Sequence, residues 1–390
     1  MSVSVQQTVN DVGNFLEAVQ ELIFSNTLNN TYKLALIIAI ADLALEEAID
    51  DIDADRDLYI SFTSLGDKFL EMYWPQANDY QTEALLENGL RLAKSGRIEQ
   101  GSNKGQLKIF SLIDDFCAAY QTATGDTHRP TYLQARRIPG FQKLVTDCTR
   151  DVVVKNPLKY IKGCEFLFTV DKSRQALVIG SAHAMMLRRF HTTVTELARH
   201  RWENKVRSLD KNAVILGESP VMSLREFLFN QTRSENLTVA RNILTDVTGE
   251  CHCFYCGCAL GKKTHVDHFL PYRIFNLPRI HNFVLACEHC NTSKSDTLVS
   301  DDHVTHWVER NVRYGNDLFG AAQEVFFPNE YQGFYRIVYD TYSNALFRNE
   351  SFWVESGKNT VYTTYPDKLE KAAFLKRFDF LLSLNHNTSS

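Results

Sequence analysis

The sequence predicts an α+β protein, with a mainly helical N-terminal region that contains one small β-hairpin, then a small cysteine-rich domain and a C-terminal extension. Three observations lead to this fold class. Apolar residues recur at helical spacing through the first 125 residues, and two short apolar runs within residues 166–180 flank a polar turn. Six of the nine cysteines fall within forty residues, between Cys251 and Cys290. We expect domains at 1–125, 126–245, 246–311 and 312–390, because a chain of 390 residues can form several cores.

The composition is that of an ordinary globular protein and predicts no membrane span. Apolar residues make up 44% of the chain and charged residues 23%, and the net charge is −5. The most apolar run, Leu34 to Ala41, is short and is followed by Asp42, which is typical of a buried helix. The N-terminus lacks the basic and apolar segments of a signal peptide. We therefore expect a cytoplasmic protein with reduced cysteines and no membrane partner.

The first predicted domain, residues 1–125, consists mainly of helices. Apolar residues from Val9 to Leu22 and from Thr31 to Ile49 predict two helices, and the acidic run that ends at Asp57 predicts a solvated loop after them. Helical periodicity also predicts helices over Glu83–Ala93 and Leu107–Tyr120.

The second predicted domain, residues 126–245, is rich in basic residues. Eight Lys or Arg and only two acids lie between Arg129 and Lys162. The runs Phe166–Val170 and Ala176–Gly180 predict a β-hairpin, and a basic helix follows over residues 188–207. Two interpretations remain open for the basic residues: a surface that neutralises phosphates, or solvated helix faces balanced by acids elsewhere in the fold.

The segments on either side of the cysteines are predicted to be helical. Leu224–Phe229 and Leu237–Leu244 predict short helices before them, and Asp301–Asn311 predicts one after them. Residues 312–390 are dense in aromatic side chains, which favours an extension that packs on the rest of the fold over a platform for stacking bases.

The cysteine spacing predicts a structural zinc site. Cys253 and Cys256 form one Cys-x2-Cys pair, and Cys287 and Cys290 form a second, thirty residues further on. Two such pairs complete a closed tetrahedral site with no open position for substrate, so we expect the zinc to stabilise the fold. Cys251 and Cys258 are the competing thiols, although the x2 spacing fits the first pair better.

Polar residues between and beside the two cysteine pairs predict a second, harder cation site. Asp267 offers an oxygen to a divalent cation, and the adjacent His268 can take a proton from water. Asn291 follows the second pair and offers an amide oxygen. Lys294 lies about one helical turn later, where it could contact phosphate.

In order, these residues resemble the signature of the HNH endonucleases, in the zinc-bearing form of the ββα-metal fold. The resemblance covers about fifty residues, Gly249 to Val299, and includes both cysteine pairs, Asp267-His268-x2-Pro271, Asn282 and Asn291-x2-Lys294. It implies a β-hairpin followed by a helix, with zinc holding the ends together.

The resemblance also implies roles for individual residues. His268 would be the general base, Asp267 and Asn291 would hold one Mg²⁺ or Mn²⁺, and Asn282 would fix the loop beside the base through backbone hydrogen bonds. Family members often have His at the position of Asn291, and the amide oxygen is an adequate substitute. Two arrangements remain open for His265: contact with the site or with phosphate, or a plain surface position.

The resulting functional prediction is a metal-dependent DNA endonuclease, in a restriction or phage-defence system. Its partners would be double-stranded DNA and a second copy of the chain or a defence-system protein. Two alternatives remain: a zinc-knuckle module that binds nucleic acid without cleaving it, and an RNA nuclease. The cations expected to contact nucleic acid are Lys294, Arg273, Arg279, Arg136, Arg137 and Arg201.

Overall fold

The chain was analysed as a computed structural model, and its α+β class agrees with the prediction. The structure describes residues 5–24, 28–46, 57–85, 91–101, 107–160, 167–216, 219–220, 223–229, 231–261, 264–275, 277–325, 327, 332–355 and 361–383. Contacts divide the chain into two compact units: unit 1 comprises residues 1–47 and 53–232, and unit 2 comprises residues 48–52 and 233–390. No helix among the described residues is both long and apolar enough to cross a membrane.

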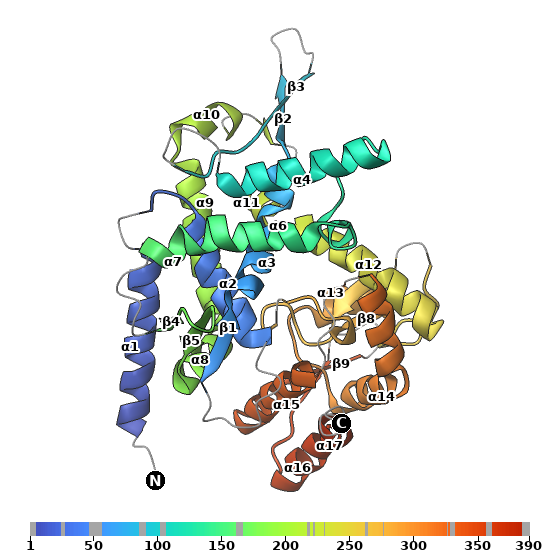
Figure 1. The fold of residues 1–390 in the computed structure, drawn as a ribbon. Coiled ribbons are helices and arrows are strands. Elements are labelled where there is room, and N and C mark those ends of the chain that lie inside the picture. The colour runs from blue at the N-terminus through green and yellow to red at the C-terminus, as the bar shows by residue number, and fades with distance from the viewer. Residues whose placement is uncertain are drawn as a thin grey trace. The chain divides into compact units, whose positions relative to one another are not determined.

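Unit 1 is built mainly from helices (Figure 1). They are α1 (Val5–Phe24), α2 (Tyr32–Glu46), α3 (Phe62–Tyr73), α4 (Lys108–Thr124), α5 (Tyr132–Ala135), α6 (Phe141–Cys148), α7 (Pro157–Tyr160), α8 (Ser181–Arg189), α9 (His191–Arg207), α10 (Asp210–Leu216) and α11 (Leu224–Phe229), with a 3₁₀ turn η1 (Pro75–Ala77) and a π-helical turn η2 (Thr149–Val154). The predicted helix at Leu107–Tyr120 corresponds to α4, and the prediction at Leu224–Phe229 matches α11.

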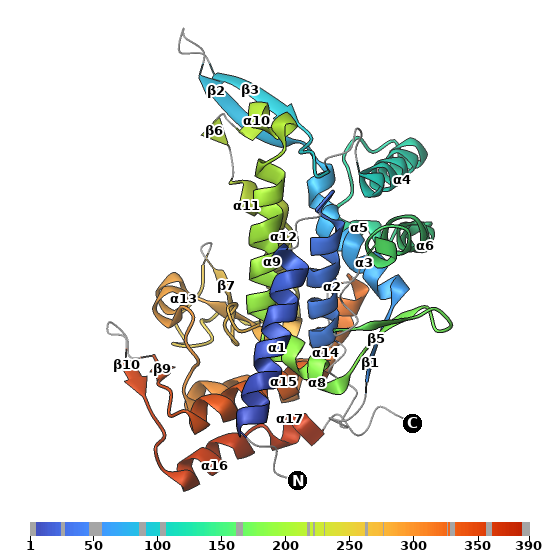
Figure 2. The same ribbon diagram turned by 90° about the vertical axis from the view of Figure 1, so that its left-hand side faces the viewer.

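Helix α2 forms the centre of unit 1. Every residue of α2 except Lys33 is buried, and α9 and α3 pack against it (Figure 2). Its two acids are paired: Asp42 with His191 Nε2 at 2.7 Å, and Glu46 with Lys68 Nζ at 2.7 Å. The apolar run at Leu34 is thus a core helix, as predicted.

A three-stranded antiparallel sheet joins distant parts of unit 1. The predicted hairpin is present as β4 (Thr169–Asp171) and β5 (Ala176–Ile179), and β1 (Leu58–Ser61) pairs with β5 on its other edge. The predicted domain boundary at residue 126 is therefore wrong, because strand pairing and the contact of α2 with α9 tie the two segments into one core.

The helix predicted at Glu83–Ala93 is also wrong. Strands β2 (Tyr80–Leu85) and β3 (Arg91–Gly96) pair antiparallel there, from Tyr80 opposite Gly96 to Leu85 opposite Arg91, and the short β6 (Ser219–Pro220) pairs with β2. The pairing of the two strands outweighs the apparent helical spacing of this segment.

Unit 2 contains the cysteine-rich segment. Its elements are α12 (Gln231–Thr248, which begins at the boundary), β7 (His265–His268), η3 (Ile280–Asn282), β8 (Phe283–Ala286), α13 (Glu288–Lys294), α14 (Asp301–Glu324), α15 (Gln332–Phe347), β9 (Phe352–Val354), β10 (Val361–Thr363), α16 (Lys368–Lys376) and α17 (Asp379–Ser383). Strands β7 and β8 pair antiparallel, and α13 follows β8 directly. Helices α12 and α14 are longer than the predicted segments.

Aromatic side chains form the core of unit 2, as the composition predicted. Trp307 of α14 stacks on Phe269 with ring centroids 4.6 Å apart, and Tyr342 of α15 stacks on Phe352 at 6.0 Å. Backbone hydrogen bonds join Trp353 of β9 to the segment just after α13. The elements after residue 311 therefore support the loops that carry the candidate site, as expected of an extension that packs on the rest.

Candidate functional site

Four thiols converge at the start of the cysteine-rich segment. The Sγ atoms of Cys253, Cys256, Cys258 and Cys287 all lie within 4.8 Å of one another. A turn shapes the first group: Gly257, with φ of 70°, donates its N–H to Cys253 O, and Cys253 N–H donates to Cys258 O. Glycine adopts this left-handed backbone without strain, so the turn can bring the three thiols of the loop to one point.

The spacing of the thiols fits a zinc ion. Sulfurs bound tetrahedrally at about 2.3 Å from zinc lie about 3.8 Å apart, and the Sγ atoms of Cys256 and Cys287 are 3.9 Å apart. Burial raises the pKa of Cys287, but the N–H of Cys290 and neighbouring thiols donate hydrogen bonds to its sulfur and together bring its pKa down to about 7. This favours the thiolate, the form that binds metal.

Cys290, the fourth predicted ligand, is fully buried, and its thiol hydrogen-bonds to those of Cys256 and Cys287. Cys258 contacts the same two thiols from an exposed position. The cluster thus contains three of the four predicted ligands, Cys253, Cys256 and Cys287, together with the competing Cys258, and the fourth predicted ligand, Cys290, contacts two of its thiols. Cys251 is exposed, and its sulfur lies 3.4 Å from Nδ1 of the adjacent His252.

A second site lies along β7 and α13, where the residues predicted for catalysis surround one cavity. The cavity has a volume of about 330 Å³, and its lining includes Asp267, His268 and Asn291 together with His265. Asp267 and His268 are the last two residues of β7, and Asn291 lies in the first turns of α13. The pairing of β7 with β8 and the immediate start of α13 bring these three side chains to one place.

Asp267 is held by two partners on one oxygen. Tyr255 Oη donates to Oδ2 at 2.6 Å, and Lys294 Nζ lies 3.1 Å from the same atom. Among the described residues, Oδ1 receives no hydrogen bond or ion pair, so it is open to a cation in the cavity. Burial, followed by the Asp267 charge, raises the pKa of Tyr255 well above its usual value, so Tyr255 stays a hydrogen-bond donor.

Asn291 is oriented in a similar way. Its Nδ2 donates to Nδ1 of His265 at 3.4 Å, which leaves its carbonyl oxygen for a cation. His265 thus contacts a residue of the site, one of the two arrangements that the sequence left open. A carboxylate oxygen and an amide oxygen, each fixed through its other polar atom, form a donor set suited to Mg²⁺ or Mn²⁺.

Asn282 makes the backbone hydrogen bonds that the sequence analysis expected. Its Oδ1 accepts from Leu270 N–H at 2.7 Å, and its Nδ2 donates to Leu270 O at 3.1 Å. Asn282 O accepts from Phe269 N–H at 2.7 Å. All three contacts fall on the loop that begins directly after His268, and Asn282 is fully buried. His268 itself packs between the rings of Tyr272 and Phe283, with centroids 5.4 and 4.7 Å away.

Two of the cations predicted to contact nucleic acid are buried, and that prediction is wrong for them. Lys294 is fully buried: its Nζ donates to His268 O at 2.8 Å and pairs with Asp267. Arg279 is only 2% exposed and donates to Pro278 O. Neither can reach a phosphate at the surface. Arg273 is exposed, and its Nε donates to Asp296 O at 3.0 Å.

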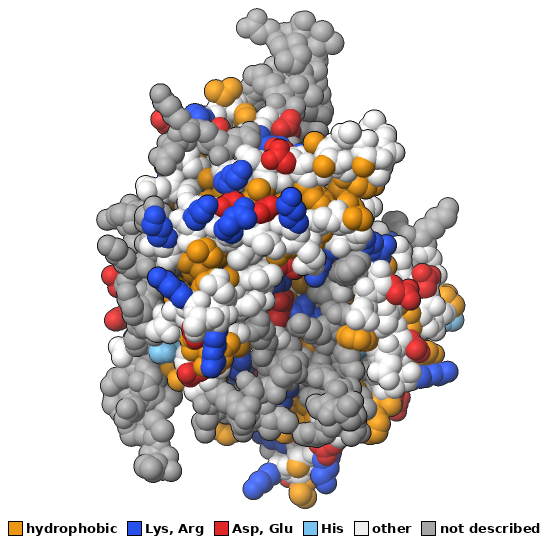
Figure 3. Space-filling model, in the orientation of Figure 1, with side chains coloured by type: hydrophobic (Ala, Val, Ile, Leu, Met, Phe, Trp, Pro, Cys, Tyr) orange, Lys and Arg blue, Asp and Glu red, His pale blue; other side chains and the backbone are white. Residues whose placement is uncertain are grey.

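The basic region of unit 1 is largely neutralised within the fold. Figure 3 shows Lys and Arg side chains gathered over α6, η2 and α7, with Asp and Glu among them. Arg150 pairs with Asp147 and Asp151 at 2.7 and 2.6 Å, and Lys155 pairs with Asp151. These contacts favour the interpretation that acids balance this surface.

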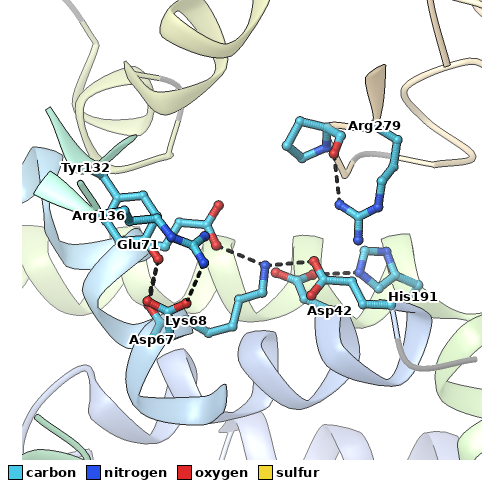
Figure 4. Close-up of polar contacts among 10 residues, drawn as sticks. Asp42, Asp67, Lys68, Glu71, Tyr132, Arg136, His191 and Arg279 are labelled. Atoms are coloured by element: carbon cyan, nitrogen blue, oxygen red, sulfur yellow. Dashed lines mark hydrogen bonds and ion pairs between the residues drawn. The ribbon is translucent and has the colours of Figure 1, made fainter. Parts of the chain in front are cut away.

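The three predicted contacts in unit 1 differ in exposure. Arg136 is half-buried, lies 3.5 Å from Asp67 and packs over the Tyr132 ring (Figure 4). Arg201 is half-buried over the Phe24 ring, and Arg137 is exposed. Their contact with nucleic acid stays a prediction, and Arg137 is the best placed of the three.

Two residues of the site were missed by sequence reasoning. Tyr255 lies inside the first cysteine pair and donates a hydrogen bond to Asp267. Arg241 lines the cavity from α12, outside the span of the resemblance. The position of Tyr255 between two predicted metal ligands was a usable signal; for Arg241 the local sequence offered none.

Comparison with known proteins places most of unit 1 in a family. Residues 13–222, more than half of the chain, match the family described as a domain of unknown function (DUF8808), so the chain belongs to this family. No curated protein matches the chain, and no solved structure does. The thiol cluster and the cavity lie beyond the matched residues.

Proposed function

We propose that the chain is a metal-dependent DNA endonuclease of the HNH class, with a structural zinc and one catalytic Mg²⁺ or Mn²⁺. One observation supports this most strongly: β7, β8 and α13 bring Asp267, His268 and Asn291 around a single cavity. A strand pair followed by a helix is the arrangement that the resemblance implied. The hydrogen bond of Asn282 to the backbone of Leu270 and the presence of a four-thiol cluster support the same proposal.

The residues divide the chemistry between them. His268 would take a proton from a water molecule, whose oxygen forms a bond to phosphorus as the bond from phosphorus to the 3′-oxygen breaks. Asp267 Oδ1 and the Asn291 carbonyl oxygen would hold the divalent cation, which would stabilise the negative charge that builds up on the phosphate. Asn282 keeps the loop after His268 in place and so holds the base in position.

Lys294 has a structural part in this proposal in place of the phosphate contact predicted from sequence. Its ammonium group ties the carbonyl of His268 to the carboxylate of Asp267, which fixes the end of β7 against α13. It also compensates the charge of a 7% exposed carboxylate, which would otherwise be costly to bury.

The test is cleavage of supercoiled plasmid with Mg²⁺ or Mn²⁺ by the full chain. We expect His268→Ala to lower the cleavage rate by about 10²–10⁴-fold, the usual contribution of a general base. His289→Ala is the matched control, because His289 is an exposed histidine on α13 outside the cavity lining. Equal cleavage by wild type and His268→Ala would refute the assignment.

Parallel substrates separate the alternatives. Cleavage of RNA with no cleavage of DNA would identify an RNA nuclease. Metal-independent binding of nucleic acid without cleavage of any substrate would identify a zinc-stabilised binding module.

A further inference from the structure

Among the described residues, the lining of the cavity that holds the proposed catalytic residues includes one side chain of the lysine or arginine type. Its described lining has three acids or histidines on β7 and one further acid, Asp296, but among lysines and arginines it includes Arg241 alone. Lys294 is close in sequence, yet its amino group is committed to Asp267 and His268. A phosphodiester entering the cavity would therefore meet one guanidinium.

The position of Arg241 on α12 directs it away from the core. Ala240, Ile243 and Leu244 of α12 are buried, whereas Arg241 is exposed. Leu237, one turn earlier, lines the same cavity. Arg241 thus lies at the wall of the cavity and is carried by a helix, and side chains carried by helices are held more precisely than those carried by loops.

Arg241 also differs from other arginines of unit 2 in its partners. Within the described residues its guanidinium makes no hydrogen bond or ion pair. Other arginines are engaged: Arg310 with His281 O and Phe283 O, Arg336 with Asp340, Arg348 with Glu350, and Arg377 with Asp301. Five donors in a planar fork, unpaired beside an acidic and imidazole-lined cavity, match the oxygens of a phosphate.

We infer that Arg241 binds a non-bridging oxygen of the scissile phosphate, from the α12 side of the cavity. This inference rests on the proposed nuclease function. The contact strengthens as negative charge grows on the phosphate during attack by water, so Arg241 contributes more to the rate than to substrate affinity.

The test compares Arg241→Ala and Arg241→Lys with Arg313→Ala in the full chain. Arg313 is an exposed arginine on α14 outside the cavity lining, so it controls for loss of one surface charge. We expect Arg241→Ala to lower the plasmid cleavage rate about 10²–10³-fold, as the loss of one oxyanion donor does. Arg241→Lys should retain part of the rate, and Arg313→Ala should stay within about twofold of wild type by the same reasoning.

A binding measurement separates failure of this inference from failure of the proposed function. A fluorescent DNA duplex is titrated with each variant in the His268→Ala background at several salt concentrations. The logarithm of the binding constant falls with the logarithm of the salt concentration, and the loss of one phosphate contact makes this negative slope shallower by about 0.9. We expect this change for Arg241→Ala and not for Arg313→Ala. If wild type cleaves and Arg241→Ala cleaves within threefold of it, Arg241 is not the contact. If wild type does not cleave, an unchanged slope overturns the inference and a reduced slope upholds the phosphate contact without the nuclease.

The thiol cluster supports a second inference, which does not depend on nuclease activity. Zinc in a structural site takes four ligands, and five thiols are present. Cys258 shares the 4.8 Å cluster with Cys253, Cys256 and Cys287, while Cys290 hydrogen-bonds to Cys256 and Cys287 from the buried side. Cys253, Cys256 and Cys287 could therefore complete a tetrahedral zinc site with either Cys258 or Cys290 as the fourth ligand.

We propose that Cys258 is an exchangeable zinc ligand that can replace Cys290. Zinc per chain is measured after dialysis against a chelator of moderate affinity. We expect about one zinc in wild type and in each of the single variants Cys258→Ser and Cys290→Ser, and loss of most zinc in the double variant. Cys251→Ser combined with Cys290→Ser is the matched control and should keep its zinc, because Cys251 lies outside the cluster. Complete loss of zinc from Cys290→Ser alone, or retention by the double variant, would overturn the proposal.

Discussion

Replacement of Asn282 by alanine tests whether the loop after His268 is held as the site requires. The side chain of Asn282 satisfies both the N–H and the carbonyl of Leu270, and both residues are fully buried. Alanine can make neither hydrogen bond, and water has no direct access to the two groups. The substitution therefore leaves two buried backbone groups without partners, next to the proposed base.

The size of the effect follows from the two lost contacts. An unsatisfied buried donor or acceptor costs about 1–3 kcal/mol, so the pair costs about 2–6 kcal/mol in the free energy of unfolding of unit 2. For a unit of this size, 1 kcal/mol corresponds to roughly 2–4 °C, so the midpoint should fall by roughly 5–20 °C. A shift of His268 by about 1 Å would lower the cleavage rate by on the order of 10²-fold.

The assay must report on unit 2 alone, because a chain of two units need not unfold in one step. Release of zinc during thermal unfolding, followed with a chromogenic chelator, provides such a signal. Hydrogen exchange at the Leu270 amide reports the local contact directly. Asn316→Ala is the matched control, since Asn316 is exposed on α14 and its loss should change the midpoint little.

Two results would refute this reasoning. One is a midpoint within the error of the control, and the other is a Leu270 amide that remains as protected in Asn282→Ala as in wild type.

Four further changes have expected outcomes. Removal of zinc by a strong chelator should unfold unit 2 and change the fluorescence of Trp307 and Trp353, and unchanged fluorescence after complete metal removal would contradict a structural zinc. Burial lowers the pKa of His281 to about 3, so between pH 6.5 and pH 3 the unfolded chain binds a proton that the folded chain does not. The free energy of unfolding should therefore decrease as the pH is lowered through this window, by up to about 1.4 kcal/mol per pH unit, and His281→Gln should make this dependence weaker. Lys294→Met should destabilise unit 2 by about 3–5 kcal/mol by leaving Asp267 unpaired, and Mg²⁺ should raise its midpoint more than that of wild type. A Cβ on Gly66 of α3 would clash with Thr149 Oγ1, so Gly66→Ala should cost about 1–3 kcal/mol in unit 1, and Thr149→Ala should recover part of it in thermal unfolding.

The sequence predicted local features of the fold well. Helix α11, the buried helix α2 and the hairpin of β4 and β5 follow from spacing and turn residues within a few positions. The donor set of the site was also predictable, because ligand chemistry depends on residue type and short-range order. Asn282 is the clearest case, since its hydrogen bonds to Leu270 are those expected.

What the sequence could not predict depends on contacts between distant segments. The pairing of β1 with β5 merges two predicted domains, and no local pattern near Leu58 indicates its partner. The sequence predicted a phosphate contact for Lys294 because this lysine follows Asn291 by about one helical turn. Its burial depends on how α13 packs against β7, which the local sequence does not reveal. The pairing of Arg136 with Asp67 likewise follows from tertiary packing.

The thiol cluster and the proposed cation site of unit 2 share structural elements. The first cysteine pair carries Tyr255, which holds Asp267, and Phe254 N–H donates to Leu285 O of β8 at 2.8 Å. Cys287 is the N-cap of helix α13, which carries Asn291 and Lys294, the residues that would complete and support the proposed cation site. Because the thiols fix both the loop and the start of the helix, a zinc ion there determines where Tyr255 and Asn291 lie. Loss of zinc should therefore weaken divalent-cation binding at Asp267 even in molecules where β7 and β8 remain paired.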